Sequence, residues 1–481
     1  MSHECFVDDI VTTFFLNTCR LHPQLTEHGS QAAAWCAMIA TTHPHDDTGG
    51  DWIPLITGSA AEFYIEPMLP HVNDIDVMFH YSTQLAIPRG HPPPTQLPAE
   101  FSNYVKVYEI VDSHLPGYVY LELRYLLTEC TDDDTYRYFT YDCGWYKPHP
   151  HHEKRYIHGP AVLQDNSSTS FLSIDGVFCI RCLSLPPQAA DWPTRHRHYD
   201  WPDSATVDCV VNNGCDVVGV AHRECKHDEW MSKHQFRLSF SRAEIVLLNS
   251  WMPLQQIVYH MLRVFVKTEP ANSHENSDHN EALNLSNYHI KTLIMWACEL
   301  KSSSFWTNDL NLIRICVDLF HTLSVWLTDA QCPHYFINNC NLLTTDSSFD
   351  VEMVISQLKS IDQAWLSTWF INNYIRECSK LCPDYVSSLF SDVSQHTKLQ
   401  NAVSAIVDWR LNTALKDMLD ELHLAELNIA VMVTHNSLTV RSCICWMTEL
   451  PKIYTHLTDY FIAVAFLLLC SKYQKLVSLT S

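Results

Sequence analysis

The sequence predicts a mixed α+β fold, and three observations support this prediction. Short apolar runs separated by turn residues, typical of strands, dominate from Asp74 to about Val220. After Trp230 the apolar residues recur at helical spacing. The chain has 481 residues, of which 47% are hydrophobic and 18% charged, so it can bury the cores of two or three globular domains.

Charge and cysteine usage narrow the class of protein. The formal net charge of −23 argues against broad, sequence-independent binding of nucleic acid, which depends on Lys and Arg beside the phosphates. The 19 cysteines show no small-domain disulfide framework and no secretory signal precedes them, so we expect reduced thiols in a cytoplasmic or nuclear protein. The apolar stretch Tyr460–Cys470 is too short to span a bilayer, so we interpret it as a buried helix and expect no membrane partner.

The N-terminal segment is expected to be mostly helical. Ile10–Leu21 is amphipathic, and Ala32–Ile39 forms a second apolar series. Trp52–Thr57 is a predicted entry strand. It leads into Gly58–Phe79, the stretch around which the rest of the chain is organised.

A predicted turn at Gly58-Ser59 opens this stretch. Glycine permits a tight turn, and its backbone N–H groups can approach a phosphate closely. The following residues, Ala60–Glu66, form a good helix start, and a helix N-terminus favours an anion. The turn therefore suits a phosphate-binding role.

Two carboxylates follow on a predicted strand. Asp74 and Asp76 are two residues apart, so they share one face of the strand. Adjacent anions repel one another and need a cation or a proton, and paired carboxylates with substrate phosphates are a usual way of holding Mg²⁺. A Gly-Ser turn before an Asp-x-Asp strand is typical of a nucleotidyltransferase. The alternative is a helix–strand unit whose acidic residues face solvent.

Further strands are expected up to Val220. Val105–Val111 and Tyr118–Leu123 flank a Leu-Pro-Gly turn and predict a hairpin. Val207–Val211 and Val217–Val220 flank an Asn-Asn-Gly turn and predict a second hairpin.

Phe171–Ile180 is a predicted apolar strand that contains one carboxylate, Asp175. Burying such a charge is costly unless it is paired or bound to a metal. This residue is therefore a third candidate ligand.

The second half of the chain is predicted to be helical. Ser241 is a candidate N-cap, with Glu244 completing a capping box. Lys267–Leu283 reads as a polar linker. After about Ser347 the pattern is again helical, with apolar spacing at Ala405, Val407 and Leu411. The predicted helices before that spacing are Glu244–Asn249, Leu254–Lys267, Ser286–Leu300, Leu310–Leu327 and Val351–Ile371.

These features occur in an order that resembles the cyclic GMP-AMP synthase (cGAS) family, which includes the cGAS-like receptors of animal innate immunity and the developmental Mab-twenty-one proteins. The resemblance covers roughly Trp52 to Leu343. The matching features are Gly58-Ser59, Asp74-x-Asp76, His158–Val162, Asp175, Trp201-Pro202, Phe236–Ser241 (FRLSFS), Ser286–Thr292 and His334–Leu342.

The resemblance implies a bilobal nucleotidyltransferase fold, with a twisted-sheet catalytic lobe and a helical C-terminal lobe. The expected domains are an N-terminal helical segment (1–51), the catalytic lobe (52–240), a helical lobe (241–345) and an additional helical region (346–481).

The resemblance also implies roles for the site residues. Asp74, Asp76 and Asp175 would form a carboxylate triad around two Mg²⁺ (or Mn²⁺) ions. The residues implied to lie near the nucleotide are Gly58 and Ser59 (triphosphate), Arg237, Ser239 and Ser241 (nucleotide), Tyr288 (stacking on a base) and Arg263 (phosphate). Simpler alternatives stay open: a core role for Tyr288, an N-cap for Ser241 and a structural ion pair for Arg237.

Two departures from the family are visible. Asp74 stands where many relatives have Glu. The His/Cys zinc insertion of vertebrate cyclic GMP-AMP synthase is absent between Asn249 and Pro253, so we expect no zinc and no vertebrate-type DNA clamp.

Two functions remain open from the sequence. The first is a cGAS-like nucleotidyltransferase that joins ATP and GTP into a cyclic dinucleotide or short oligonucleotide, switched on by double-stranded RNA or another ligand. The second is a non-catalytic Mab-twenty-one-like interaction protein, for which the acidic composition and the C-terminal helical region suggest a protein partner.

Overall fold

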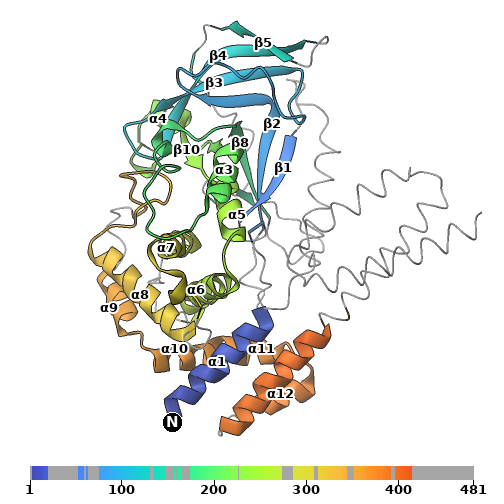
Figure 1. Cartoon of the computed structure of the whole chain (residues 1–481), viewed down its shortest axis with the longest axis vertical. Helices are drawn as coiled ribbons and strands as arrows, with labels where there is room; N and C mark the ends of the chain where they lie inside the picture. The colour runs from blue at the N-terminus through green and yellow to red at the C-terminus, as the bar shows by residue number, and fades with distance from the viewer. Residues whose placement is uncertain are drawn as a thin grey trace, which may run out of the picture. The chain divides into compact units, whose positions relative to one another are not determined.

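The computed structural model describes most of the region between residues 52 and 413 (Figure 1). Its residues group into two compact units, the first within 1–13 and 27–378 and the second within 14–26 and 379–481. The described residues are 3–19, 52–58, 61–62, 75–130, 135–141, 144–146, 157–158, 161–163, 174–225, 227–272, 285–307, 312–343, 351–391, 396–413 and 416.

The first unit contains a ten-stranded sheet, in the order β1-β2-β3-β4-β10-β9-β8-β7-β6, with β5 on β4 and an additional pairing of β2 with β8. The strands are β1 (Trp52–Thr57), β2 (Ile75–Pro88), β3 (Tyr104–Asp112), β4 (Tyr118–Cys130), β5 (Thr135–Thr140), β6 (Ile157–His158), β7 (Ala161–Leu163), β8 (Ile174–Cys182), β9 (Cys215–Val218) and β10 (Gln235–Ser239).

Strand β2 is central because it pairs with three neighbours. It runs antiparallel to β1 and parallel to both β3 and β8. Its register with β8 shifts between His80 and Leu85, which marks a bulge. The second half of β2 can thereby pair with β3 while the first half keeps β1 and β8 on either side.

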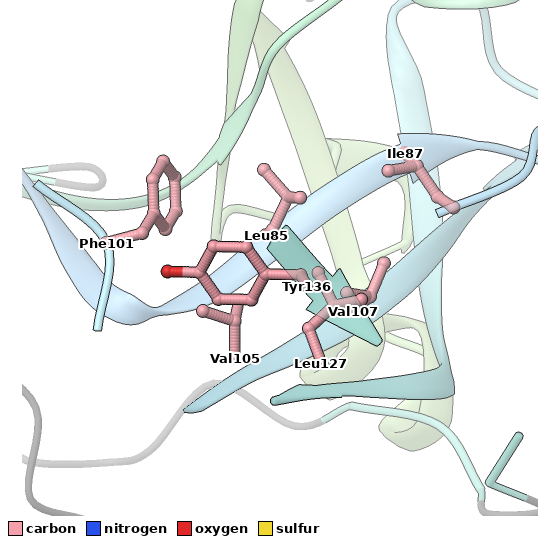
Figure 2. Packing of buried hydrophobic residues seen from close by; sticks show 7 residues of the cluster. All are labelled: Leu85, Ile87, Phe101, Val105, Val107, Leu127 and Tyr136. Atoms are coloured by element: carbon pink, nitrogen blue, oxygen red, sulfur yellow. The ribbon is translucent and has the colours of Figure 1, made fainter. Parts of the chain in front are cut away.

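One core cluster lies at the β3–β4–β5 end of the sheet. Figure 2 shows it as aliphatic side chains from β2, β3 and β4 around the ring of Tyr136. Its phenol donates a hydrogen bond of 3.1 Å to the carbonyl of Ser102, so the one polar atom of this ring is satisfied. The cluster consists of Leu85, Ile87, Phe101, Val105, Val107, Leu127 and Tyr136.

The first predicted hairpin is confirmed, and the second is wrong. β3 and β4 pair antiparallel around Gly117, whose φ is +83°. Residues 207–211 are helical instead, inside α3 (Ser204–Asn213). Asp203 caps that helix by accepting the Thr206 N–H at 2.7 Å, and Gly214 ends it with φ +62°.

Among the described residues of the first unit, helices accompany the sheet: α3 packs against α5, and α5 packs against β9. Figure 1 shows α3 and α5 next to each other. Three residues separate α5 from α6, which confirms the short connection predicted there. The helices that lie wholly or partly in this unit are α1 (His3–Cys19), α3, α4 (Glu229–His234), α5 (Ser241–Asn249), α6 (Pro253–Asn272), α7 (Asn287–Leu300), α8 (Leu312–Thr328), α9 (Val351–Ser360), α10 (Gln363–Trp369), a π-helical turn η8 (Phe370–Ile375) and α11 (Arg376–Lys380), with 3₁₀ turns η3 (Pro187–Ala189), η4 (Arg223–Cys225) and η6 (Ser303–Phe305).

Three helix predictions need correction. The single helix expected over 351–371 is broken, because Asp362 accepts the Trp365 N–H at 2.8 Å and starts α10. Helix α6 continues to Asn272, beyond the predicted start of the polar linker. The capping box at Ser241 is wrong: Phe240 is the N-cap without a side-chain bond, and the Glu244 carboxylate binds Lys291.

The second unit contains α12 (Asp384–Ser391) and a helix over residues 396–413. The helical prediction for this region is confirmed for those residues. In the helix over residues 396–413, the buried residues differ from those of the predicted apolar spacing. Leu411 is 39% exposed, whereas the buried residues are Leu399, Ala402, Val403 and Ile406.

Several predictions concern residues outside the described ones, namely Ala32–Ile39, Ser59, Asp74 and Tyr460–Cys470. Among the helices that are described, none combines the length and the apolar character needed to cross a membrane.

Candidate active site

Gly58 and Asp76 touch at the end of the β1–β2 ladder. Gly58 follows the last residue of β1 and has φ +60°, a left-handed conformation that favours glycine. A Cβ at this position would lie 2.1 Å from Oδ2 of Asp76. The Asp76 carboxylate therefore lies directly against the Gly58 backbone, and both the turn and this contact require glycine.

The sheet register brings Asp76 and Asp175 together. They are paired residues on the parallel strands β2 and β8, and Thr57 is the partner of Asp76 on β1. Two of the three predicted acidic positions are thus neighbours across adjacent strands, although they are about a hundred residues apart in sequence. Asp74 directly precedes the first described residue of β2.

The end of β10 lies on the same side of β2 as Asp76. Ser239 Oγ is 4.0 Å from Sδ of Met78, which shares a face of β2 with Asp76. Ser239 Oγ also lies 3.1 Å from Oγ of Ser241, the first residue of α5. Both predicted hydroxyls therefore lie next to this face of the sheet.

Arg237 and Tyr288 belong to one electrostatic neighbourhood. Arg237 is exposed on β10, and Tyr288 is half-buried on α7. Burial raises the pKa of the Tyr288 phenol well above its usual range, Glu244 raises it further, and the cations Lys291 and Arg237 oppose this shift. The phenol oxygen also lies 3.2 Å from Nε2 of His334.

Arg263 is buried on α6, with 5% of its surface exposed. Its charge lowers the pKa of Glu62, although burial raises that pKa overall, and it helps to lower the pKa of His260 to about 3. The structure thus places this cation near the carboxylate four residues after Gly58.

Sequence reasoning missed a buried ion cluster beside the Gly58 turn. Lys291 Nζ binds Glu62 and also lies 3.0 Å from Glu244 Oε2. All three side chains are buried. No local sequence pattern indicates this cluster, because Glu244 fits a capping box and Lys291 is a single lysine within a predicted helix.

A second missed cluster lies on the same sheet face, under α5. Arg242 Nε is 2.8 Å from Asp216 Oδ2, and the Asp216 side chain is fully buried. Arg242 Nη2 is 3.5 Å from Nδ1 of His80, and Cys179 Sγ is 3.8 Å from Asp216 Oδ1. Burial, with the Arg242 and Arg181 charges, lowers the pKa of His80 to about 3, so this imidazole is neutral at pH 7.

The donor set suits a hard divalent cation. Carboxylate oxygens are the ligands that Mg²⁺ prefers, and Asp76 lies beside a backbone that approaches closely because residue 58 is glycine. Among the described side chains, no three His, Cys, Asp or Glu residues cluster around one point. The side chains of Asp74 and Asp175 lie outside the described ones, so Asp76 is the predicted ligand whose side chain the structure describes.

Comparison with known proteins identifies two domains. Residues 143–250 match the Mab-21 protein nucleotidyltransferase domain, and residues 254–360 match the Mab-21 protein HhH/H2TH-like domain. The first match contains Asp175, Arg237 and both serines, and the second contains Arg263 and Tyr288. Gly58 and Asp76 precede both.

A curated relative points the same way. The chain is 27% identical over 107 residues to a cyclic GMP-AMP synthase-like receptor of Lucilia cuprina, a match covering 22% of this chain and 26% of the relative. The alignment thus spans about a quarter of that protein. The chain carries the two domains of the Mab-21 proteins, a nucleotidyltransferase domain followed by a helical HhH/H2TH-like domain, on a mixed α+β fold.

Proposed function

We propose that the protein is a metal-dependent nucleotidyltransferase that joins ATP and GTP into a cyclic dinucleotide or short oligonucleotide. The observation that carries the proposal is the contact of the Asp76 carboxylate with the left-handed Gly58, with Asp175 paired to Asp76 in the sheet. The proposed phosphate-binding turn and two of the three proposed metal ligands then lie next to each other in the fold.

In this proposal Asp74, Asp76 and Asp175 hold two Mg²⁺ or Mn²⁺ ions. When bound, the ions would polarise the α-phosphate and lower the pKa of the attacking ribose hydroxyl. The ribose oxygen then forms the new bond to the α-phosphorus, the bond to pyrophosphate breaks, and the hydroxyl proton passes to solvent.

The remaining residues bind and orient the nucleotide. The Gly58-Ser59 turn would present backbone N–H groups to the triphosphate. Arg237 is exposed, so its guanidinium is accessible for charge-assisted contacts. The adjacent hydroxyls of Ser239 and Ser241 would accept or donate hydrogen bonds at the same face, and the ring of Tyr288 would stack on a base.

The relative's name, a cyclic GMP-AMP synthase-like receptor, supports a cyclic dinucleotide as the product and control of the activity by a ligand. Our proposal also includes a role in innate immune signalling in the cytoplasm with double-stranded RNA as the activating ligand, and this part rests on the family resemblance of the sequence. The second candidate is a non-catalytic Mab-21-like interaction protein. It is favoured by the formal charge of −23, because an acidic chain repels triphosphates and polyanionic activators alike.

Incubation of the purified protein with labelled ATP, GTP and Mg²⁺ or Mn²⁺, with and without double-stranded RNA or DNA, separates the two candidates. Product that disappears in Asp175→Asn but persists in Asp208→Asn, an exposed aspartate of α3, supports the enzyme. Absence of product from the folded wild type under every condition favours the interaction protein.

A further inference from the structure

Polar contacts connect five side chains of the first unit. His334 bonds Tyr288, Glu244 and Glu62 both bond Lys291, and Tyr288 and Lys291 lie three residues apart on α7. These residues come from the segment after α8, from α7, from α5 and from the Gly58 turn. We call this set of five residues the positioning relay.

The direction of the hydrogen bonds at His334 is fixed by the backbone. Nδ1 accepts the N–H groups of Phe336 at 3.0 Å and Ile337 at 3.1 Å. Burial lowers the pKa of His334 to about 4, so the ring is neutral at pH 7 and its one proton is on Nε2. Nε2 therefore donates to the Tyr288 phenol oxygen at 3.2 Å. His334 thereby holds the Tyr288 hydroxyl in place.

Glu244 lies near the Tyr288 hydroxyl, where its charge adds to the effect of burial and raises the pKa of the phenol, and it accepts from Lys291 Nζ at 3.0 Å. The same ammonium binds Glu62. Burial acts to lower the pKa of Lys291, but the Glu244 and Glu62 carboxylates outweigh it and raise that pKa well above its usual range, so Lys291 is charged.

Glu62, at one end of the relay, belongs to the turn that follows Gly58. The N–H groups of Ala61 and Glu62 both donate to the Gly58 carbonyl at 3.1 Å. Asn249, at the end of α5, donates to the Ala61 carbonyl at 3.4 Å. The turn is thus fastened through its backbone by α5 and through Glu62 by Lys291 of α7.

We propose that the relay fixes the Tyr288 ring and the Gly58 turn relative to each other, and that His334, Lys291 and Glu62 are positioning residues that set the affinity for a nucleoside triphosphate. The proposal rests on the proposed function in one respect, that the turn and the ring bind the triphosphate and the base. The competing explanation is a buried ion cluster that contributes only to stability.

The variants break the relay at separate points. Tyr288→Phe keeps the ring and removes the hydrogen bond from His334. Glu62→Gln removes the charge at the turn with little change in size. Lys291→Met leaves two buried carboxylates without their cation, which is strongly destabilising, so Lys291→Arg tests rescue by a second cation. The control is Lys233→Met, which removes an exposed ion pair with Glu229.

The first measurement needs no nucleotide. Hydrogen exchange at the amides of Ala61 and Glu62 should accelerate at least about tenfold in Glu62→Gln, because the turn loses its anchor in the protein core. Lys291→Arg and Lys233→Met should exchange like the wild type. Wild-type protection in Glu62→Gln overturns the relay, whatever the protein does with nucleotides.

The second measurement is calorimetric binding of MgATP. Tyr288→Phe and Glu62→Gln should each weaken the Kd about tenfold, comparable to the loss of one hydrogen bond, when measured at a temperature at which both variants are folded. In an active preparation KM should rise and kcat should stay. Unchanged affinity in both variants overturns the positioning role. A wild type that binds no MgATP refutes the proposed function, and the exchange experiment then decides the relay alone.

Discussion

Two buried ion clusters of the first unit have opposite compositions. Under α5, one carboxylate, Asp216, lies near the guanidiniums of Arg242 and Arg181. In the positioning relay one ammonium, Lys291, lies between the carboxylates of Glu62 and Glu244. Each cluster would leave like charges facing each other if its central group were removed, so each is costly to break.

The two clusters connect different parts of the fold. Asp216 and Arg242 attach α5 to β9, an attachment within the sheet and the helix that covers it. The relay instead joins the turn after β1 to α5 and α7, so it spans the residues proposed to bind the triphosphate and the base. Two ion clusters of similar burial thus have different consequences: one stabilises the sheet, and the other is proposed to hold two binding elements in position.

The largest expected effect tests the sheet cluster. Asp216→Asn leaves the buried Arg181 and the partly buried Arg242 without their carboxylate, and we expect the free energy of unfolding to fall by about 3–5 kcal/mol. Urea unfolding followed by tryptophan fluorescence measures this change. The exposed Asp208→Asn should stay within about 0.5 kcal/mol of the wild type. A loss below about 1 kcal/mol in Asp216→Asn would show that the cluster does not stabilise the sheet.

Acid should weaken both clusters through their histidines. Burial lowers the pKa of His80 to about 3 and of His334 to about 4, below the ordinary value near 6.5. At pH below 6.5 the unfolded chain therefore binds more protons than the folded one, so stability falls as pH drops towards the folded pKa values. For His334 the loss between pH 7 and 5 is about 2 kcal/mol. Urea unfolding at both pH values, with His334→Gln showing a shallower dependence, checks it, and equal stability at the two pH values would contradict buried neutral imidazoles.

Alanine substitutions at two glycines distinguish the effect of backbone strain from the effect of disturbing Asp76. Gly58→Ala and Gly90→Ala both place a side chain at positive φ, +60° and +79°, which costs roughly 1–2 kcal/mol. Only at Gly58 does the new Cβ meet Asp76, whereas nothing lies within 4 Å of Gly90. We expect similar losses in melting temperature but abolished turnover in Gly58→Ala alone. Equal turnover in the two variants would show that the Gly58 turn has no part in the reaction.

The sequence predicts features that depend on neighbours along the chain. The β3–β4 hairpin and the Gly58–Asp76 arrangement follow from turn residues and from strand periodicity. The relay could not be predicted, because Lys291 and Glu62 are 229 residues apart and only the tertiary fold brings them together. The failures at Glu244 and α3 have a related cause. At Glu244 the pattern of a capping box competed with a distant ion partner. At α3 two valine-containing segments around an Asn-Asn-Gly turn suggested a hairpin, whereas the Asp203 cap starts a helix.

The smallest expected change in stability belongs to the residue with the largest proposed role in catalysis. Asp76→Asn keeps the size of a half-buried side chain and removes one charge from an acidic neighbourhood, so the free energy of unfolding should change by no more than about 0.5 kcal/mol. Turnover with ATP, GTP and Mg²⁺ should nevertheless be lost, because an amide binds Mg²⁺ poorly compared with a carboxylate. Thermal unfolding and product formation, measured on one preparation, test the unchanged stability and the lost turnover. A large drop in melting temperature would make Asp76 a structural residue like Asp216, and the contrast between the sheet cluster and the site would then disappear.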